Sequence, residues 1–332
     1  MSSRLPRVSV ATLGGTITMT SAVPGAGVVP TANAHDLLAA VPGLDALSDL
    51  HLETLLKKPG ASLDVTDILL VLDWANARIA DGSAGVVVVQ GTDTLEDVAY
   101  LLDLLWAHDE PLVLTGAMRD RAQLSPDGPS NLHAAVAAAA YPGCRGLGVI
   151  VVMNNEIHAA RRVTKGDTCS LGAFSSGPFG MLGRLHEGRV TVANRPARLA
   201  PLVRPSTADA VVAVIESALG DRGDTLRLAL QNSAVSGVVL AGFGAGHLHE
   251  DAARAIDASL VPVVLASRTG RGPLLETTYG FPGSERDLIA RGAIPAGWLT
   301  ARQARLLLLL FISNAATVDD LHSTFAAHGG TP

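Results

Sequence analysis

The residues of this chain that could perform nucleophilic chemistry come after segments that are typical of buried strands. Thr16 follows the apolar segment VSVATL and two glycines, Thr92 and Asp93 follow GVVVVQG, and Lys165 ends a polar stretch after GVIVVM. Short β-branched segments bounded by turn residues indicate such strands. In open α/β sheets, ligands bind beyond the carboxyl ends of the strands. The four side chains are therefore candidates for a common site.

A pair of hydroxyls, an amine and a carboxylate are the types that acyl transfer needs. A threonine hydroxyl is a poor nucleophile at neutral pH and requires a group that accepts its proton. A lysine accepts it when the amine is unprotonated, and burial favours that form because it lowers the pKa of an ammonium group. A second hydroxyl can relay the proton, and a carboxylate can orient the amine. Thr16, Thr92, Asp93 and Lys165 supply these types, and their spacing alone leaves their convergence open.

Each of these residues also has an ordinary structural interpretation. Asp93, with Glu96 three positions later, is a capping-box pattern for the helix that follows. Thr92 can bond within a turn, Lys165 can be a solvated charge, and Ser62 can bond to the backbone of its own loop. Considered one at a time, the residues leave both interpretations open.

The hydrophobic pattern alternates strands with helices and predicts parallel βαβ units in both halves of the chain. Hydrophobic residues make up 48% of the 332 residues and aromatic residues only 4%, which suits Val-rich strands covered by Ala- and Leu-rich helices. The predicted strands are residues 8–13, 85–90, 111–115, 148–153, 210–215, 237–241 and 262–266. The predicted helices are residues 34–41, 68–79, 95–105, 132–140, 221–233, 248–259 and 300–313.

We therefore predict an α/β fold in two domains. A larger N-terminal domain, residues 1–192, has a mostly parallel sheet flanked by helices, and a smaller C-terminal α/β domain, residues 210–332, has a parallel sheet. The segment 193–209 has several prolines and no periodicity, and it is the predicted linker. Residues 18–30, 57–67 and 125–131 are predicted loops, the first long enough for a functional lid.

Charge and cysteine content exclude several functional classes. The net charge of −6, without a long basic run, argues against a nucleic-acid partner. The two cysteines are too few for a disulfide framework and lack the spacing of metal ligands. His247, His249 and Glu250 lie close in sequence but lack the further ligands that a metal site needs. No apolar segment reaches the roughly 20 residues of a membrane-spanning helix, and the absence of an apolar signal segment before the first strand favours a cytoplasmic location.

Five motifs, in this order, resemble those of the bacterial-type L-asparaginases: TLGGTITM, VVQGTDTLED, VLTGAMR, DGPSNL and RRVTK. The second half adds AGFGAGH, SRTGRG, TYGF and the segment TARQARLLLLL, which is similar to the closing helix of that family. The resemblance covers nearly the whole chain. GGT alone is a weak signal, whereas the ordered set of five is highly specific.

The resemblance implies an amidohydrolase that converts L-asparagine into L-aspartate and ammonia, without a metal or an organic cofactor. Thr16 matches the nucleophilic threonine, which attacks the side-chain amide and forms a β-acyl-enzyme. Thr92 matches the second catalytic threonine and Lys165 the lysine beside it. Asp93 matches the carboxylate that completes this triad and also holds the substrate's α-ammonium group.

The resemblance also implies the substrate-binding positions. Ser62 matches the residue that binds the substrate's α-carboxylate, and the backbone around Thr92 and Ala117 would line the reacting amide, with N–H groups for the oxyanion. Leu63 stands where a glutamine often helps to bind the ammonium group, so we expect glutamine to be a poor substrate. Val28 stands where many members carry a lid tyrosine, which puts the order of that loop in question.

Members of this family are homotetramers built from intimate dimers, in which the second domain of a neighbour closes each site. The asparagines that cross this interface match Ala245 and His247, and the acidic residue that accompanies them matches Glu276. His247 is either such an interfacial residue or a turn histidine on the surface. Two other functions share the fold: an amidotransferase subunit, which usually has an additional N-terminal domain, and a non-catalytic sensor of aspartate or asparagine.

Overall fold

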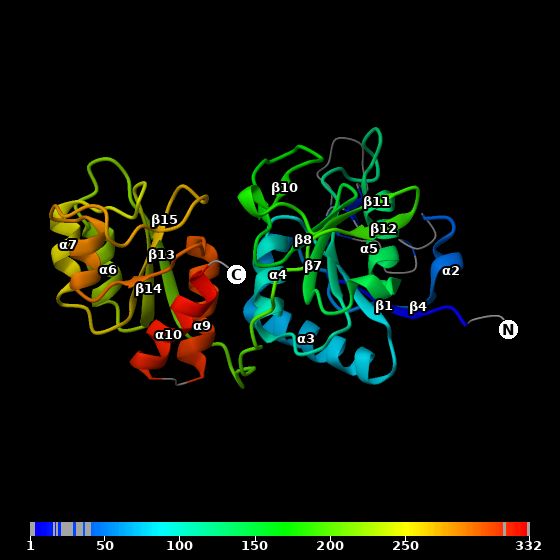
Figure 1. Ribbon diagram of the computed structural model, residues 1–332, viewed down its shortest axis with the longest axis horizontal. Helices are drawn as coiled ribbons and strands as arrows, with labels where there is room; N and C mark the ends of the chain where they lie inside the picture. The colour runs from blue at the N-terminus through cyan, green and yellow to red at the C-terminus, as the bar shows by residue number, and fades with distance from the viewer. Residues whose placement is uncertain are drawn as a thin grey trace. The chain divides into compact units, whose positions relative to one another are not determined.

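The computed structural model describes residues 4–15, 17, 19–20, 29–30, 36, 41–314 and 317–330. The chain divides into two compact units, Met1–Leu202 and Val203–Pro332, and each is described by itself (Figure 1). No helix among the described residues is long and apolar enough to cross a membrane.

The first unit is built on one mixed sheet with the strand order β12-β11-β8-β7-β6-β5-β1-β4. The strands from β4 to β7 are parallel, and β8, β11 and β12 continue the sheet in antiparallel pairing. These strands are β1 Arg7–Thr12, β4 Asp49–Thr54, β5 Gly85–Val89, β6 Leu112–Thr115, β7 Val149–Met153, β8 Glu156–Ala159, β11 Gly183–His186 and β12 Arg189–Val192.

The order of the parallel strands locates a ligand site. The chain passes from β1 to β4 on one side and then crosses to β5 on the other side of β1. A crevice opens at such a reversal, beyond the carboxyl ends of the two strands that flank it. The topology therefore points to the ends of β1 and β5.

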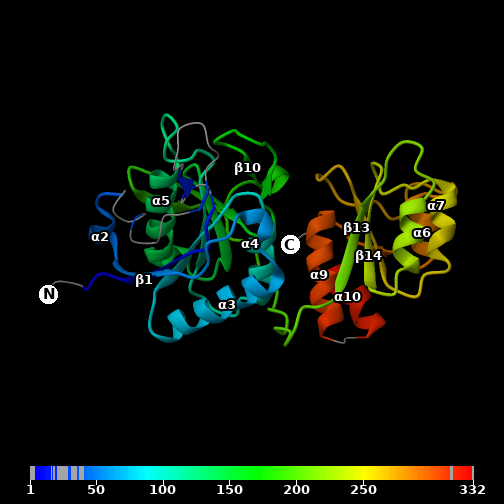
Figure 2. The ribbon, with the colours of Figure 1, turned by 180° about the vertical axis from the view of Figure 1, so that it is seen from behind.

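Helices cover both faces of this sheet and thereby bury its central strands on both sides. Helices α3 Val65–Ala80 and α4 Leu95–Leu105 pack on one face, and α5 Gly128–Ala140 packs on the other with α2 Leu44–Leu47 (Figures 1 and 2). Val87, Val113 and Ile150 lie in the core that α5 covers. The shorter elements are β2 Met19–Thr20, β3 Val29–Pro30, η2 Gly60–Ser62, η3 Pro142–Cys144, β9 Thr164–Lys165, β10 Phe174–Ser175 and η4 Gly177–Phe179.

The second unit contains the parallel sheet β13-β14-β15-β16. Helix α9 packs on one face of this sheet, and α6 and α7 lie on the other (Figure 2). Its elements are β13 Val211–Glu216, α6 Asp224–Gln231, β14 Val235–Gly242, α7 Glu250–Ile256, β15 Val263–Ser267, α8 Glu285–Ala290, β16 Ile294–Pro295, α9 Ala301–Ser313 and α10 Val318–Gly329.

The predicted fold class is confirmed: a larger α/β unit with a mostly parallel sheet precedes a smaller one with a parallel sheet. The predicted loop 125–131 is partly wrong, because α5 already begins at Gly128 with Pro129 in its first turn. A proline is tolerated there since the first N–H groups of a helix have no intrahelical partner. The predicted loop 57–67 likewise ends early, because Asp64 caps α3 and forms a capping box with Asp67. The predicted helix 34–41 falls largely outside the described residues.

The antiparallel strands were not predicted. Asn154 and Asn155 both have positive φ and form the two-residue turn from β7 to β8. Glu187 and Gly188 do the same between β11 and β12. Two-residue hairpin turns with positive φ at both positions match the twist of the sheet, and asparagine and glycine favour them. Strand β4 and helices α8 and α10 were also missed.

Candidate active site

Glycines bring three chain segments into backbone contact beyond the carboxyl ends of β1, β4 and β5. Gly15 has a φ of 93°, and a Cβ atom there would collide with the backbone of Gly91. A Cβ atom on Gly60 would come within 3.2 Å of the Gly91 carbonyl oxygen. Any side chain at Gly15 would therefore push the first segment off the third. This packing places the Thr92 loop against the turn that carries Ser62.

Lys165 meets Thr92 and Asp93 at this edge of the sheet. Its Nζ atom donates a hydrogen bond of 2.9 Å to Thr92 Oγ1 and lies 3.5 Å from Asp93 Oδ1. Thr92 is buried and the Lys165 side chain is 16% exposed, whereas the Asp93 side chain is 64% exposed. The hydroxyl–amine contact is thus shielded from water, while the carboxylate beside it is open to a ligand.

Of the two interpretations of Asp93 and Glu96, the structure does not support the helix cap. Helix α4 begins after Thr94, so Asp93 is not the N-cap residue, and the Thr94 side chain makes no capping hydrogen bond. The Thr94 hydroxyl instead donates to the Gly60 carbonyl at 2.9 Å. Glu96 is buried, and its Oε2 atom accepts a 3.0 Å hydrogen bond from the backbone N–H of Lys165. Both carboxylates therefore serve contacts with a distant residue, which a local pattern does not reveal.

Asp127 and Asn131 hold the turn that contains Ala117. The Asp127 carboxylate accepts hydrogen bonds from the backbone N–H groups of Met118 and Arg119 at 2.9–3.1 Å. Asn131 Nδ2 donates to the Gly116 carbonyl and to Asp127, both at 3.0 Å. Sequence reasoning assigned neither residue a role, although both lie in the quoted motif DGPSNL.

The buried Ala117 turn also reaches the Thr92 loop. A Cβ atom on Gly116 would lie 3.3 Å from the Thr92 side chain and still closer to the Gln90 carbonyl oxygen. Gly116 therefore allows the turn after β6 to approach the loop after β5. Ala117 and Thr92, which were predicted to flank the reacting amide, are in neighbouring segments.

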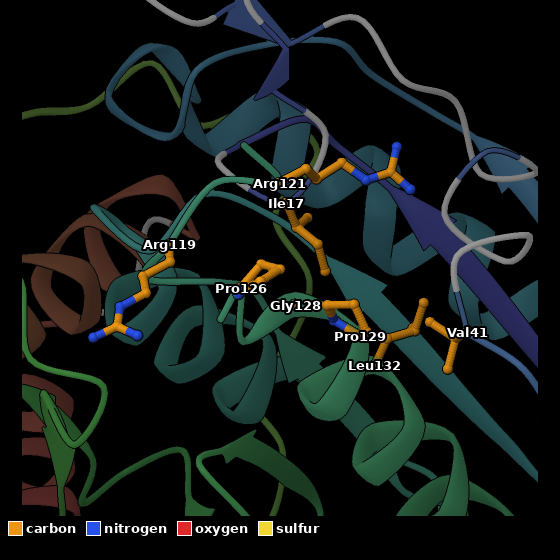
Figure 3. Close-up of a pocket in the computed structure, with 8 residues that line it drawn as sticks. All are labelled: Ile17, Val41, Arg119, Arg121, Pro126, Gly128, Pro129 and Leu132. Carbon is orange, nitrogen blue, oxygen red and sulfur yellow. The ribbon is translucent and has the colours of Figure 1, made fainter. Parts of the chain in front are cut away.

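The neighbours of Thr16 are anchored on both sides, although Thr16 lies outside the described residues, as does Val28. Gly15 packs against Gly91, and Ile17 is buried against Gly128 at the start of α5. Figure 3 shows Ile17 entering a small pocket with Gly128 and other apolar groups, while the guanidinium groups of Arg119 and Arg121 point away from it. The pocket suits an apolar side chain rather than a zwitterion.

Ser62 ends the η2 turn and is exposed, and the adjacent Leu63 is half-buried. The preceding Lys58 ties this turn to α3, because its Nζ atom contacts both carboxylate oxygens of Asp67 at 2.7 and 2.8 Å. The Lys58 backbone N–H donates to the Leu13 carbonyl at 2.9 Å, just beyond β1. Lys58 therefore ties this turn both to α3 and to the residue that follows β1.

In the second unit, His247 contacts a carboxylate that sequence reasoning missed. Its Nε2 atom lies 3.1 Å from Oε2 of the fully buried Glu285. Burial alone would raise the pKa of Glu285, but hydrogen bonds from the Tyr279 N–H and from His247 outweigh it and hold the pKa below its ordinary value. The rings of Tyr279 and Phe281 flank the imidazole edge-to-face. Glu276, which was predicted as the acidic residue, is exposed.

Among the described residues, neither a metal-binding cluster nor the arginine-lined hollow of the second unit forms a competing site. No group of three or more His, Cys, Asp or Glu residues in the described part of the chain could hold a metal ion. A hollow between α6 and α7 is lined by Arg222, Arg227 and Arg254, and each of these arginines is paired with Asp224 or Asp251. The positive charges of these arginines are therefore balanced by carboxylates that line the same hollow.

Comparison with known protein families identifies the family to which both units of the chain belong. Residues 7–198 match the family described as "Asparaginase, N-terminal", and residues 211–325 match the "Glutaminase/Asparaginase C-terminal domain". The chain belongs to the asparaginase family. The two matches of this asparaginase-family protein lie in its first and second units, respectively.

Similar proteins cover the asparaginase-family chain along almost its whole length. The "Probable L-asparaginase" of Deinococcus radiodurans is 35% identical over 98% of this chain and 98% of its own. The "Probable L-asparaginase periplasmic" of Haemophilus influenzae is 32% identical over 93% of this chain and 89% of its own. The crystal structure of a "Probable Cytoplasmic L-asparaginase" from Campylobacter jejuni superposes with a TM-score of 0.87 at 29% identity, covering 96% of this chain and 99% of that one. Since these names include both compartments, the cytoplasmic location stays a prediction.

Proposed function

We propose that this protein hydrolyses L-asparagine to L-aspartate and ammonia. The observation that carries the proposal is the shielded contact between Lys165 Nζ and Thr92 Oγ1, with the solvent-open Asp93 carboxylate beside it. The contact lies at the reversal of strand order, where α/β sheets bind their ligands. Membership of the asparaginase family supports the substrate class.

In the proposed reaction, the Thr16 hydroxyl attacks the side-chain amide carbon of asparagine. The hydroxyl proton leaves through Thr92 and Lys165, the C–N bond breaks, and the nitrogen departs as ammonia after gaining a proton. Water then attacks the β-acyl-enzyme, which releases aspartate and restores the threonine. Gly15 and Ile17, which flank this residue in the chain, pack against Gly91 and Gly128 respectively.

The geometry also supports a division of binding roles. We assign the α-ammonium group to Asp93 and the α-carboxylate to Ser62, because both side chains are open to solvent at the same edge of the sheet. The N–H groups of Met118 and Arg119 are already bonded to Asp127. We assign the oxyanion to the N–H groups of Thr92 and Ala117, which lie in neighbouring segments. The apolar Leu63 beside Ser62 supports a preference for asparagine over glutamine.

We further propose that residues 1–192 form the catalytic domain, that 193–209 are a linker, and that 210–332 close the site of a neighbouring subunit in a homotetramer. In this arrangement, His247 and Glu276 belong to the face that meets the neighbour. Sedimentation velocity tests the assembly, and a monomer that is fully active would contradict it.

Ammonia release from L-asparagine tests the function, with the wild type compared with Thr16→Ala and Lys165→Met. We expect activity in the wild type and a loss of at least about 100-fold in kcat for each variant. Thr16→Ala removes the nucleophile, and Lys165→Met removes a proton-transfer step that contributes about 10²–10⁴-fold. L-aspartate is expected to raise the melting temperature of all three proteins. A wild type that releases no ammonia but is stabilised by aspartate would be a sensor instead. The reason to test this alternative is the valine at position 28, where many members of the family carry a lid tyrosine.

A further inference from the structure

We infer that Glu96 is a positioning residue for Lys165, and this inference rests on the function proposed above. The short segment 92–96 contacts Lys165 at two different places. Thr92 and Asp93 contact its amine, while Glu96 Oε2 accepts the hydrogen bond from its backbone N–H. Glu96 thus determines where the main chain of the lysine lies relative to the two groups that its amine must reach.

The lysine needs such a contact because its own strand is very short. Strand β9 has two residues and pairs with the equally short β10, through Lys165 with Phe174 and Thr164 with Ser175. Among the described residues, β9 and β10 pair only with each other and are not strands of the large sheet. A flexible lysine arm on this hairpin would reach Thr92 in many geometries. A contact from the main body of the unit is therefore required to select one.

Glu96 is suited to this task because it is itself held in place. It lies in the first turn of α4, where the neighbouring Leu95 is fully buried and Thr94 bonds to Gly60. The Glu96 residue is only 6% exposed, so its rotamers are restricted by packing. A buried carboxylate is costly unless it accepts hydrogen bonds, and the Lys165 N–H supplies one. The two residues are 69 positions apart, so this bond connects the hairpin to the helix that follows the Thr92 loop.

Two substitutions separate the length of this side chain from its charge. Glu96→Gln keeps the length and an acceptor oxygen but removes the charge, whereas Glu96→Asp keeps the charge and shortens the arm by one methylene group. We expect Glu96→Gln to retain kcat within about 3-fold. We expect Glu96→Asp to lose about 10- to 100-fold in kcat with KM nearly unchanged, because a displacement of about 1 Å in a catalytic group has effects of that size. Asp97→Ala, in the same turn of α4, is the matched control for effects on the helix itself and is expected to keep kcat.

A second measurement does not depend on catalysis. Hydrogen exchange at the Lys165 amide is expected to be slow in the wild type and in Glu96→Gln and at least about 10-fold faster in Glu96→Asp. Equal exchange and equal kcat in the Asp variant and the wild type would overturn the inference. So would the reverse order, with Gln impaired and Asp active, because the charge would then matter more than the contact. A Lys165→Met variant that keeps full activity would instead refute the proposed function, while the exchange result would still test the contact.

Discussion

Replacing Asp127 tests whether the turn around Ala117 is organised as the hydrogen bonds indicate. The Asp127→Ala substitution removes the acceptor of the Met118 and Arg119 backbone N–H groups and of the Asn131 side-chain amide. Met118 and Arg119 are half-buried, so water replaces these bonds only in part. At a net value of about 1 kcal/mol for each of the three bonded donors, we expect the free energy of unfolding to fall by about 3 kcal/mol.

The Asp127→Asn variant refines this prediction. An asparagine keeps one oxygen for the two backbone N–H groups, but its amide nitrogen then faces Asn131 Nδ2, which is also a donor. We therefore expect an intermediate loss of about 1–2 kcal/mol. Because the turn contacts the Thr92 loop, both variants are also expected to lower kcat for ammonia release, the alanine by about 10- to 100-fold.

Urea unfolding followed by circular dichroism measures the stability, and ammonia release measures the rate. Arg121→Ala is a control for the loss of an exposed hydrogen bond, because its guanidinium group donates to the Asp36 carbonyl at 2.8 Å and points away from the pocket beside this turn (Figure 3). An Asp127→Ala variant as stable as the wild type would show that the turn does not depend on these bonds. A loss of stability with unchanged kcat would show that the turn does not contribute to the site.

Two further predictions concern substrate choice and pH. Leu63→Gln is expected to raise kcat/KM for glutamine by about 10-fold, because it places a polar side chain next to Ser62. Ammonia release from asparagine and from glutamine measures this selectivity. An unchanged ratio of the two kcat/KM values would show that Leu63 does not determine specificity. For Glu285, the folded-state pKa lies below its ordinary value of 4.5, so its contribution to stability is complete above that value and is lost as the pH falls through the lower pKa of the folded state. Glu285→Gln is expected to flatten the decrease in urea midpoint below about pH 4.5, and an unchanged acid profile would contradict this linkage.

The amino-acid sequence by itself determined the α/β class and the sites where chemistry could be placed. Short apolar, β-branched segments that end at turn residues predicted the strands β1, β5, β6 and β7, because period and composition are local properties of the chain. The same segments singled out Thr92, Asp93 and Lys165, which the structure brings together. The predicted nucleophile Thr16 stays a prediction.

The tertiary structure decided which partner each polar group takes. Asp93 and Glu96 have the spacing of a helix cap, yet both contact Lys165, about 70 positions away. Likewise, the buried Glu285 rather than the exposed Glu276 contacts His247, because β14 and α8 bring those residues to one place. A carboxylate bonds to whichever donor the fold places nearest, and sequence spacing does not contain that distance.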